Sequence, residues 1–408
     1  MRQPYADENG VRSPDEFGGS RRNFLKTSAL AALLLGGPGV TSASAAGRGR
    51  RHDDGQFTVD GHQIYDPNGD QFVGIGANLD GVRSAWGSYT PAEKYVEAVV
   101  DHWRLNIVRA AHHYEFRDEV ASGGWPVLEG GFTWQEIVDA YTQHNVVVMP
   151  EVHDFTGGLF NDAIDGDLDY GLEDLKDFWA DIAQQFGDNP YVWFNIMNEP
   201  GEGDSDQYYD EWVHWHNECI DVIRDQGANN VITVNGMYWG QDAGAQWSSG
   251  RTRVEKHESA ILSRGREILD HDPAGNVVFD FHVYDQWTVS DEMETMLENF
   301  IEDAYDQGLS LFVGEWGAPE NPWSQHMKDG APDVLPTILP YNVGSTMWHG
   351  EPGDGFKPTY DGGLTTIDHT KNPSNLTWWQ GEPLWEATRR NIGKTVRRQK
   401  RRQPRSSR

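Results

Sequence analysis

The feature that most constrains the fold of this chain is a series of short apolar runs separated by longer amphipathic segments. Eight such runs occur, at residues 72–76, 106–110, 146–150, 192–196, 231–234, 277–281, 309–313 and 345–348. They are rich in Val, Ile and Phe without polar alternation, which is typical of parallel strands buried on both faces. The segments between them include helical patterns, such as residues 172–186 and a segment opened by Pro91. Eight strand–helix units with right-handed crossovers predict an α/β fold, a (β/α)8 TIM barrel.

Both ends of the chain differ from this central pattern. Residues 1–46 contain Arg21-Arg22, an apolar run from Ala29 to Val40 and the sequence Ala43-Ser44-Ala45, as in a twin-arginine signal peptide. Residues 389–408 hold ten basic and no acidic residues, which predicts a disordered tail. We therefore expect a single folded domain at residues 47–388, with the twin-arginine export machinery as a partner and secretion as the outcome.

The domain itself begins with a hairpin signal. Two strand-like runs in residues 57–73 flank the turn residues Pro67-Asn68-Gly69. We expect this short N-terminal β-hairpin to close the bottom of the barrel.

The charge of the chain limits its partners and its environment. The net charge is −31, and residues 47–388 alone hold 18 basic and 60 acidic residues, a formal charge of −42. Such a surface repels nucleic acid. Molar salt shortens the Debye length to about 3 Å and screens this self-repulsion, so the composition favours a halophilic, haloarchaeal-type enzyme. The chain has a single cysteine, Cys219, so it cannot form an intrachain disulfide, and we expect Cys219 to be a core residue. We expect no stable membrane insertion, because the apolar runs are too short to span a membrane.

Polar and aromatic residues stand where the predicted strands end. In a (β/α)8 barrel these ends form the mouth that carries the active site. The residues at these positions are Arg109, His153, Asn198, Glu199, His282, Tyr284, Glu315 and Trp348.

Two of these residues, Glu199 and Glu315, are carboxylates on the fourth and seventh strands, which we expect to face each other across the mouth. Glycoside hydrolysis needs one carboxylic acid to protonate the leaving oxygen and a second carboxylate to attack the anomeric carbon. In retaining enzymes the two groups lie about 5–5.5 Å apart. The negative nucleophile would keep Glu199 protonated, whereas hydrogen bonds from Arg109 and Tyr284 would keep Glu315 ionised.

The motifs around these residues resemble glycoside hydrolase family 5, the retaining cellulase and mannanase family. The matching stretches, in the family's order, are NIVRA (106–110), EVHD (151–154), WFNIMNEP (193–200), FDFHVYD (279–285), LFVGEWG (311–317) and MWHG (347–350). The resemblance implies that Glu199 is the acid/base and Glu315 the nucleophile. It also implies that Asn198 holds the sugar 2-hydroxyl, that Arg109 and Tyr284 orient Glu315, and that His153, His282 and Trp348 line the −1 site.

Further substrate contacts are expected from tryptophans, because pyranose faces stack on indole rings. Of the 17 tryptophans, we select Trp239 and Trp287 as sugar-stacking residues. The acidic loop Asp162–Asp169 has alternate oxygen ligands that could bind calcium, but it lacks the rest of an EF-hand pattern and reads better as a salt-solvated loop. We therefore expect no metal and no cofactor.

The sequence thus predicts a secreted, retaining endo-β-1,4-glucanase that acts on a polysaccharide by double displacement. An endo-β-1,4-mannanase with the same residues is the alternative, because EVHDFTGG (151–158) is similar to the histidine loop of some bacterial mannanases of the family. A non-catalytic carbohydrate-binding barrel is remote, since it predicts the loss of a carboxylate and both are present. The motifs do not distinguish glucose from mannose, which differ at C2.

Overall fold

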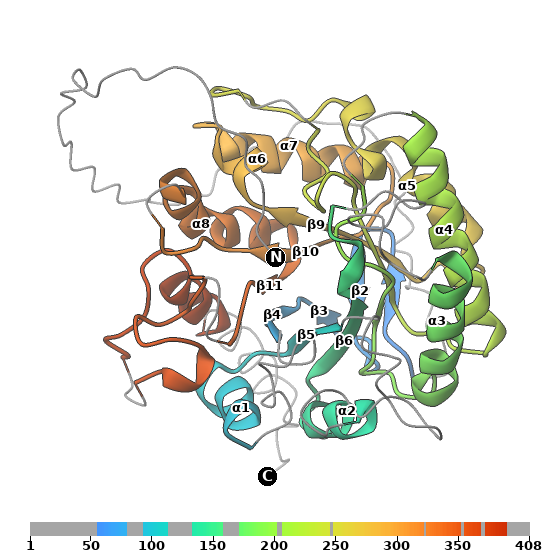
Figure 1. The fold of residues 1–408 in the computed structure, drawn as a ribbon, viewed down its shortest axis with the longest axis horizontal. Helices are drawn as coiled ribbons and strands as arrows, with labels where there is room; N and C mark the ends of the chain where they lie inside the picture. The colour runs from blue at the N-terminus through green and yellow to red at the C-terminus, as the bar shows by residue number, and fades with distance from the viewer. Residues whose placement is uncertain are drawn as a thin grey trace, which may run out of the picture. The chain divides into compact units, whose positions relative to one another are not determined.

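The computed structural model describes residues 55–79, 93–112, 133–157, 171–201, 206–244, 248–321, 324–351, 355–368 and 372–389 (Figure 1). All of them belong to one compact unit that spans residues 48–408. The predicted signal peptide at 1–46, the basic tail from residue 390 and the acidic loop Asp162–Asp169 lie outside the described residues. None of the helices in the described segments combines the length and hydropathy that a membrane span requires.

Eight parallel strands close into a barrel at the centre of this unit (Figure 1). They are β4 (Ile75–Leu79), β5 (Ile107–His112), β6 (Val147–Val152), β7 (Phe194–Asn195), β8 (Ile232–Asn235), β9 (Val277–Val283), β10 (Leu311–Trp316) and β11 (Gly344–Met347). Their order around the barrel follows the chain, and β11 pairs with β4 to close it. The predicted (β/α)8 fold is therefore confirmed.

Helices surround the barrel and connect its strands (Figure 1). The labelled α-helices are α1 (Glu93–Glu97), α2 (Trp134–Thr142), α3 (Leu172–Phe186), α4 (Asp206–Asp225), α5 (Ala260–His271), α6 (Asp285–Thr288), α7 (Met293–Asp306) and α8 (Gln325–Ile338). Residues 381–389 are also helical. Shorter turns are the π-helix η2 (Ala98–Trp103) and the 3-10 helices η4 (His153–Phe155), η6 (Lys256–Glu258), η8 (Leu339–Tyr341) and η9 (Leu364–Thr366). The predicted helix at 172–186 is α3, and Cys219 is buried in α4.

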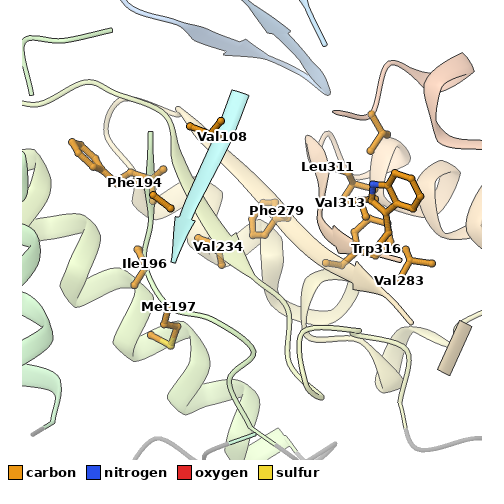
Figure 2. Close-up of a cluster of buried hydrophobic side chains, with 14 of the residues drawn as sticks. Val108, Phe194, Ile196, Met197, Val234, Phe279, Val283, Leu311, Val313 and Trp316 are labelled. Atoms are coloured by element: carbon orange, nitrogen blue, oxygen red, sulfur yellow. The ribbon is translucent and has the colours of Figure 1, made fainter. Parts of the chain in front are cut away.

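Successive side chains of each strand point to opposite faces of the sheet, so one set packs outward against the helices and the other set faces the barrel interior. On β9, for example, Phe279, Phe281 and Val283 pack outward against the helices, within the larger hydrophobic cluster. Figure 2 shows part of this outer layer, with side chains contributed by β5, β7, β8, β9 and β10. The intervening residues face the barrel interior, where Val278 is apolar but Asp280 and His282 are polar and buried.

The apolar interior residues lie at the amino ends of the strands and form the floor of the barrel. They include Ile107, Val147, Trp193, Val231, Val278 and Phe312. Phe57 and Ile64 from the N-terminal segment complete this floor, with the Phe57 ring packed edge-on against Trp193 at 5.4 Å. The predicted closure of the barrel bottom is thus confirmed. The segment is a three-stranded sheet rather than one hairpin, formed by β1 (Thr58–Asp60), β2 (Gln63–Tyr65) and β3 (Gln71–Phe72).

Candidate active site

The residues selected from the strand ends gather at the carboxyl end of the barrel. Arg109 lies in β5, Glu315 in β10 and His282 near the end of β9. His153, Tyr284 and Trp348 directly follow strands, and Asn198 and Glu199 lie in the segment after β7. The barrel interior is thus apolar at its floor and polar in its upper layers.

Glu199 and Glu315 form a close pair at this mouth. A carboxylate oxygen of each lies within 4.8 Å of the other, and both side chains are buried. Although β8 and β9 separate their strands, a β-bulge between Val313 and Glu315 places Glu315 beside His282 on β9. Such bulges commonly redirect a side chain next to an active site. The spacing matches the two-carboxylate geometry of retaining glycosidases rather than the wider separation that inverting enzymes need for a water.

Glu199 is held in an unusual backbone conformation. Its φ of 45° lies in the left-handed region, which costs energy for any residue with a Cβ. Two hydrogen bonds hold this conformation, since the Glu199 amide donates to Asn235 Oδ1 at 2.7 Å and its carbonyl accepts from Gly157 at 2.9 Å. Glu199 Oε1 lies 2.7 Å from Nδ1 of His282. The acid is therefore fixed at both its backbone and its side chain.

Arg109 organises the polar layer beneath the pair. Its guanidinium is fully buried and donates to Glu315 Oε1 at 2.8 Å and to Asn198 Oδ1 at 2.6 Å. Asn195 and Asn78 accept further hydrogen bonds from Arg109 at 3.1 and 2.9 Å. The fork-shaped donor geometry of arginine suits this simultaneous contact with several acceptors.

The electrostatic surroundings separate the two carboxyl groups. Burial raises the pKa of Glu199 well above its usual range, the charge of Glu315 raises it further, and Arg109 only partly opposes this. Burial also raises the pKa of Glu315, but Arg109 and the Tyr284 hydroxyl, which donates to Oε2 at 2.8 Å, oppose this, so the pKa of Glu315 is about 7. The pair therefore loses its first proton from Glu315, which leaves an acid at Glu199 beside an ionised Glu315, as expected from the sequence.

The histidines and Trp348 line the same mouth. Burial lowers the pKa of His282 well below its usual range, so this ring is neutral beside Glu199. The rings of His153 and Trp348 stack at 5.3 Å with an interplanar angle of 14°. Asn198 donates to the Thr156 hydroxyl at 2.8 Å, which ties the residue before Glu199 to the loop after β6.

The two selected tryptophans behave differently. Trp239 lies in the loop after β8, and it is 40% exposed, so its ring is available for sugar stacking. The prediction for Trp287 is wrong, because this side chain is fully buried. Its ring packs against Phe281 and Phe300, and its indole nitrogen donates to the Gln241 carbonyl at 2.9 Å. Trp287 is thus a core residue of the short helix α6.

Sequence reasoning missed several residues that support the site. Asn235 accepts a hydrogen bond from the Glu199 amide, and Asn78 and Asn195 accept hydrogen bonds from Arg109. Gly240 has a φ of +66°, and a Cβ there would lie 2.9 Å from both Glu199 Cγ and His282 Nδ1. A signal existed for the asparagines, because Asn195 and Asn235 stand at strand ends, whereas Gly240 became apparent only from its neighbours in space.

Three side chains at the mouth offer ligand atoms within 4.8 Å of one another, those of Glu199, His282 and Glu315. The chemistry of the set suits proton transfer better than metal binding. Arg109 already places its positive charge 2.8 Å from Glu315, and His282 Nδ1 is engaged by Glu199. A divalent cation at this position would have to displace these contacts.

Comparisons with known proteins agree with this geometry. The chain is 28% identical over 266 residues to a mannan endo-1,4-beta-mannosidase of Salipaludibacillus agaradhaerens, covering 64% of this chain and 71% of that one. It is 28% identical over 269 residues to the beta-mannanase/endoglucanase A of Caldicellulosiruptor saccharolyticus, covering 62% of this chain but only 17% of that longer protein.

Solved structures support the fold. The crystal structure of beta-mannanase from Streptomyces thermolilacinus superposes with a TM-score of 0.58 at 21% identity, covering 81% of this chain and 95% of that one. The model of the cellulase family, glycosyl hydrolase family 5, matches residues 65–353, which hold every residue of the mouth described above. The chain therefore belongs to glycosyl hydrolase family 5.

Proposed function

We propose that this protein is a retaining endo-β-1,4-glucanase that uses Glu315 as nucleophile and Glu199 as acid/base. The observation that carries the proposal is the buried carboxylate pair, whose oxygens lie within 4.8 Å and whose electrostatic surroundings differ. Relatives named endoglucanase and mannosidase support β-1,4-linked polysaccharide as the substrate class.

Two displacements follow from this arrangement. In the first, a Glu315 oxygen bonds to the anomeric carbon while Glu199 gives its proton to the departing glycosidic oxygen, and the glycosidic bond breaks. The glycosyl ester removes the charge of Glu315, so the pKa of Glu199 falls and this carboxylate can accept a proton from water. The water oxygen then bonds to the anomeric carbon, the ester breaks, and both residues return to their starting states. A sugar hydroxyl in place of water would give transglycosylation.

The two roles are separable by experiment. Glu315→Ala is expected to lose hydrolysis of all substrates, because no covalent intermediate forms. Glu199→Ala is expected to lose hydrolysis of polysaccharide but to keep a burst of aglycone from aryl cello-oligosaccharides, since a good leaving group needs no proton. Near-normal activity of a correctly folded Glu315→Ala variant would show that the assignment of the nucleophile is wrong.

Mannan is the second candidate substrate. It is favoured by the Salipaludibacillus relative and by residues 151–158, which are similar to the histidine loop of some bacterial mannanases. The test is reducing-end release in molar salt from a soluble cellulose derivative and from an unbranched mannan, side by side. Release mainly from mannan would assign the enzyme to the mannanases and leave the mechanism unchanged.

We also propose that the enzyme is a haloarchaeal-type protein that is exported by the twin-arginine route and works in concentrated salt. The support is the arginine pair Arg21-Arg22 with its apolar run, and the formal charge of −42 on residues 47–388. Hydrolysis is expected to rise between 0.1 and 3 M salt, because the Debye length then falls from about 10 Å to below about 3 Å. Equal activity and melting temperature across this range would contradict salt adaptation, and replacement of Arg21-Arg22 by lysines should block export.

A further inference from the structure

A third buried carboxylate, Glu151, lies beside the catalytic pair without a role in the two displacements. It stands near the end of β6, where Val147 and Met149 face the barrel interior. The two-residue period of the strand therefore turns Glu151 inward as well, one layer above Met149. Its side chain is fully buried in the polar layer of the mouth.

Among the contacts of Glu151 with described residues, the shortest is with His153. Glu151 Oε1 lies 2.6 Å from His153 Nδ1, which is the length of a strong hydrogen bond. Arg109 is farther away, with Nη2 at 3.6 Å from Oε2. Arg109 is also closer to Asn198 and Glu315, at 2.6 and 2.8 Å, than to Glu151. The contact with His153 is thus the interaction that most specifically depends on Glu151.

This contact determines where the imidazole carries its proton. An ionised Glu151 can only accept a hydrogen bond from His153, so Nδ1 is the protonated nitrogen whenever the ring is neutral. The same bond, together with the stack on Trp348 at 5.3 Å, fixes the plane of the ring. In this tautomer Nε2 is the unprotonated nitrogen, which accepts hydrogen bonds. The same logic holds in serine proteases, where a buried aspartate sets the tautomer of the catalytic histidine.

We propose that Glu151 is a positioning residue that acts through His153, by fixing the Nδ1–H tautomer and the ring orientation required at the −1 site. The inference rests on the proposed hydrolysis by Glu199 and Glu315, and it adds a residue to that site. In addition to burial, the charge of Glu151 raises the pKa of both Glu199 and Glu315, and this direct effect does not depend on His153. The part of its effect on the rate that passes through the imidazole ring must disappear when His153 is absent.

The test is a double-mutant cycle of Glu151→Gln and His153→Ala, with kcat and KM measured for wild type, both single variants and the double variant. Glutamine keeps the shape of Glu151 but offers either an amide oxygen or an NH2 group to Nδ1, so it no longer selects one tautomer. We expect Glu151→Gln to lower kcat/KM by about 10- to 100-fold, as is typical when the partner that orients a histidine is lost. In the His153→Ala background the same change should cost less than about threefold.

A matched control distinguishes the positioning effect of Glu151 from the general effect of losing a buried carboxylate. Asp272 is a buried acid paired with Arg224 at 2.8 Å, and it precedes β9, whereas the site residue His282 lies near the end of that strand. Asp272→Asn should lower the melting temperature while leaving kcat/KM within about twofold, because it breaks a buried ion pair outside the mouth. Melting temperatures of all variants identify those that fold.

Histidine nitrogen NMR gives a readout that does not require activity. The chain has 15 histidines, and the His153→Ala variant identifies the signals of His153 in spectra of protein labelled with 15N-histidine. Wild type should show a protonated Nδ1, and Glu151→Gln should show a mixture of tautomers. An unchanged tautomer, or an equal loss of kcat/KM in both backgrounds, would overturn the inference. A wild-type enzyme that cleaves neither cellulose nor mannan would instead refute the proposed function, and the NMR result would still stand.

Discussion

The hydroxyl of Tyr284 gives the sharpest prediction about the nucleophile. It donates to Glu315 Oε2 at 2.8 Å, and this bond lowers the pKa of Glu315 against the effect of burial. The Tyr284 ring is held independently by edge contacts with His282 and Phe356, at 6.2 and 5.9 Å. Tyr284→Phe therefore removes one hydrogen bond while the ring stays in place.

The magnitude follows from the strength of that bond. A hydrogen bond to a charged acceptor contributes about 1.5–3 kcal/mol, and about 1.4 kcal/mol corresponds to one pH unit. The pKa of Glu315 is about 7 in the wild type. Loss of the Tyr284 hydroxyl removes a hydrogen-bond donor to Glu315, so the pKa of Glu315 rises in the variant. Glu315 attacks only when it is ionised. The acid limb of kcat/KM should therefore shift to higher pH by about one to two units, and activity below pH 6 should fall by about 10- to 100-fold.

The assay is the pH dependence of kcat/KM between pH 4 and pH 10, at constant molar salt, for wild type and Tyr284→Phe. The melting temperature of the variant serves as the control for folding. The basic limb, which reports Glu199, should move much less, because the Tyr284 hydroxyl donates to Glu315 and not to Glu199. An acid limb that stays within about 0.3 of its wild-type position would refute the reasoning, since a bond of this length to an ionised group must shift its titration.

Three further predictions concern the support of the site. Gly240→Ala should lower kcat by about 100-fold, since the added Cβ would displace Glu199 and His282, and kinetics at constant melting temperature check this. Glu315→Gln should raise the melting temperature relative to wild type, increasingly from about pH 4.5 to pH 7. The sign follows because the pKa of Glu315 is raised to about 7 in the folded protein, so the protonated side chain favours the folded state at low pH and this contribution is lost as pH rises. A difference in melting temperature between variant and wild type that is constant with pH would contradict the prediction. Trp239→Ala should raise KM for polysaccharide by about 3- to 10-fold through the loss of sugar stacking, with kcat on short aryl glycosides unchanged.

The barrel was predictable because its strands are buried on both faces. Such strands appear as unbroken apolar runs, and seven of the eight predicted runs overlap the observed strands closely. The first run was placed at 72–76, whereas β4 spans Ile75–Leu79. The reason is that Phe72 belongs to β3, a strand of the separate three-stranded sheet that leads directly into the barrel. An apolar run does not reveal which of two sheets it joins.

The site was predictable where its residues stand at strand ends, and it was not predictable in the loops. Trp287 follows β9 by four residues, as a cleft residue could. The helical turn of α6 rotates its ring into the core instead, where the Gln241 carbonyl satisfies its indole nitrogen. Gly240 and Gln241 are adjacent, yet Gly240 lies against Glu199 and Gln241 accepts the indole hydrogen bond of Trp287. Only the path of this loop in space distinguishes them.

The charge balance of the mouth connects the fold to its chemistry. Four carboxyl groups, Glu151, Glu199, Asp280 and Glu315, surround the single guanidinium of Arg109, and all five side chains are largely buried. One positive charge cannot compensate four buried negative charges, because each unpaired charge costs several kcal/mol. The mouth must therefore retain protons near neutral pH, in agreement with the raised pKa values of Glu199, Glu315 and Asp280. Of the two carboxyl groups in the proposed mechanism, Glu315 accepts a hydrogen bond from Arg109, whereas the pKa of Glu199 is raised well above its usual range by burial and by the charge of Glu315. The crowded barrel therefore keeps a proton on Glu199, where the proposed mechanism needs it for the leaving oxygen.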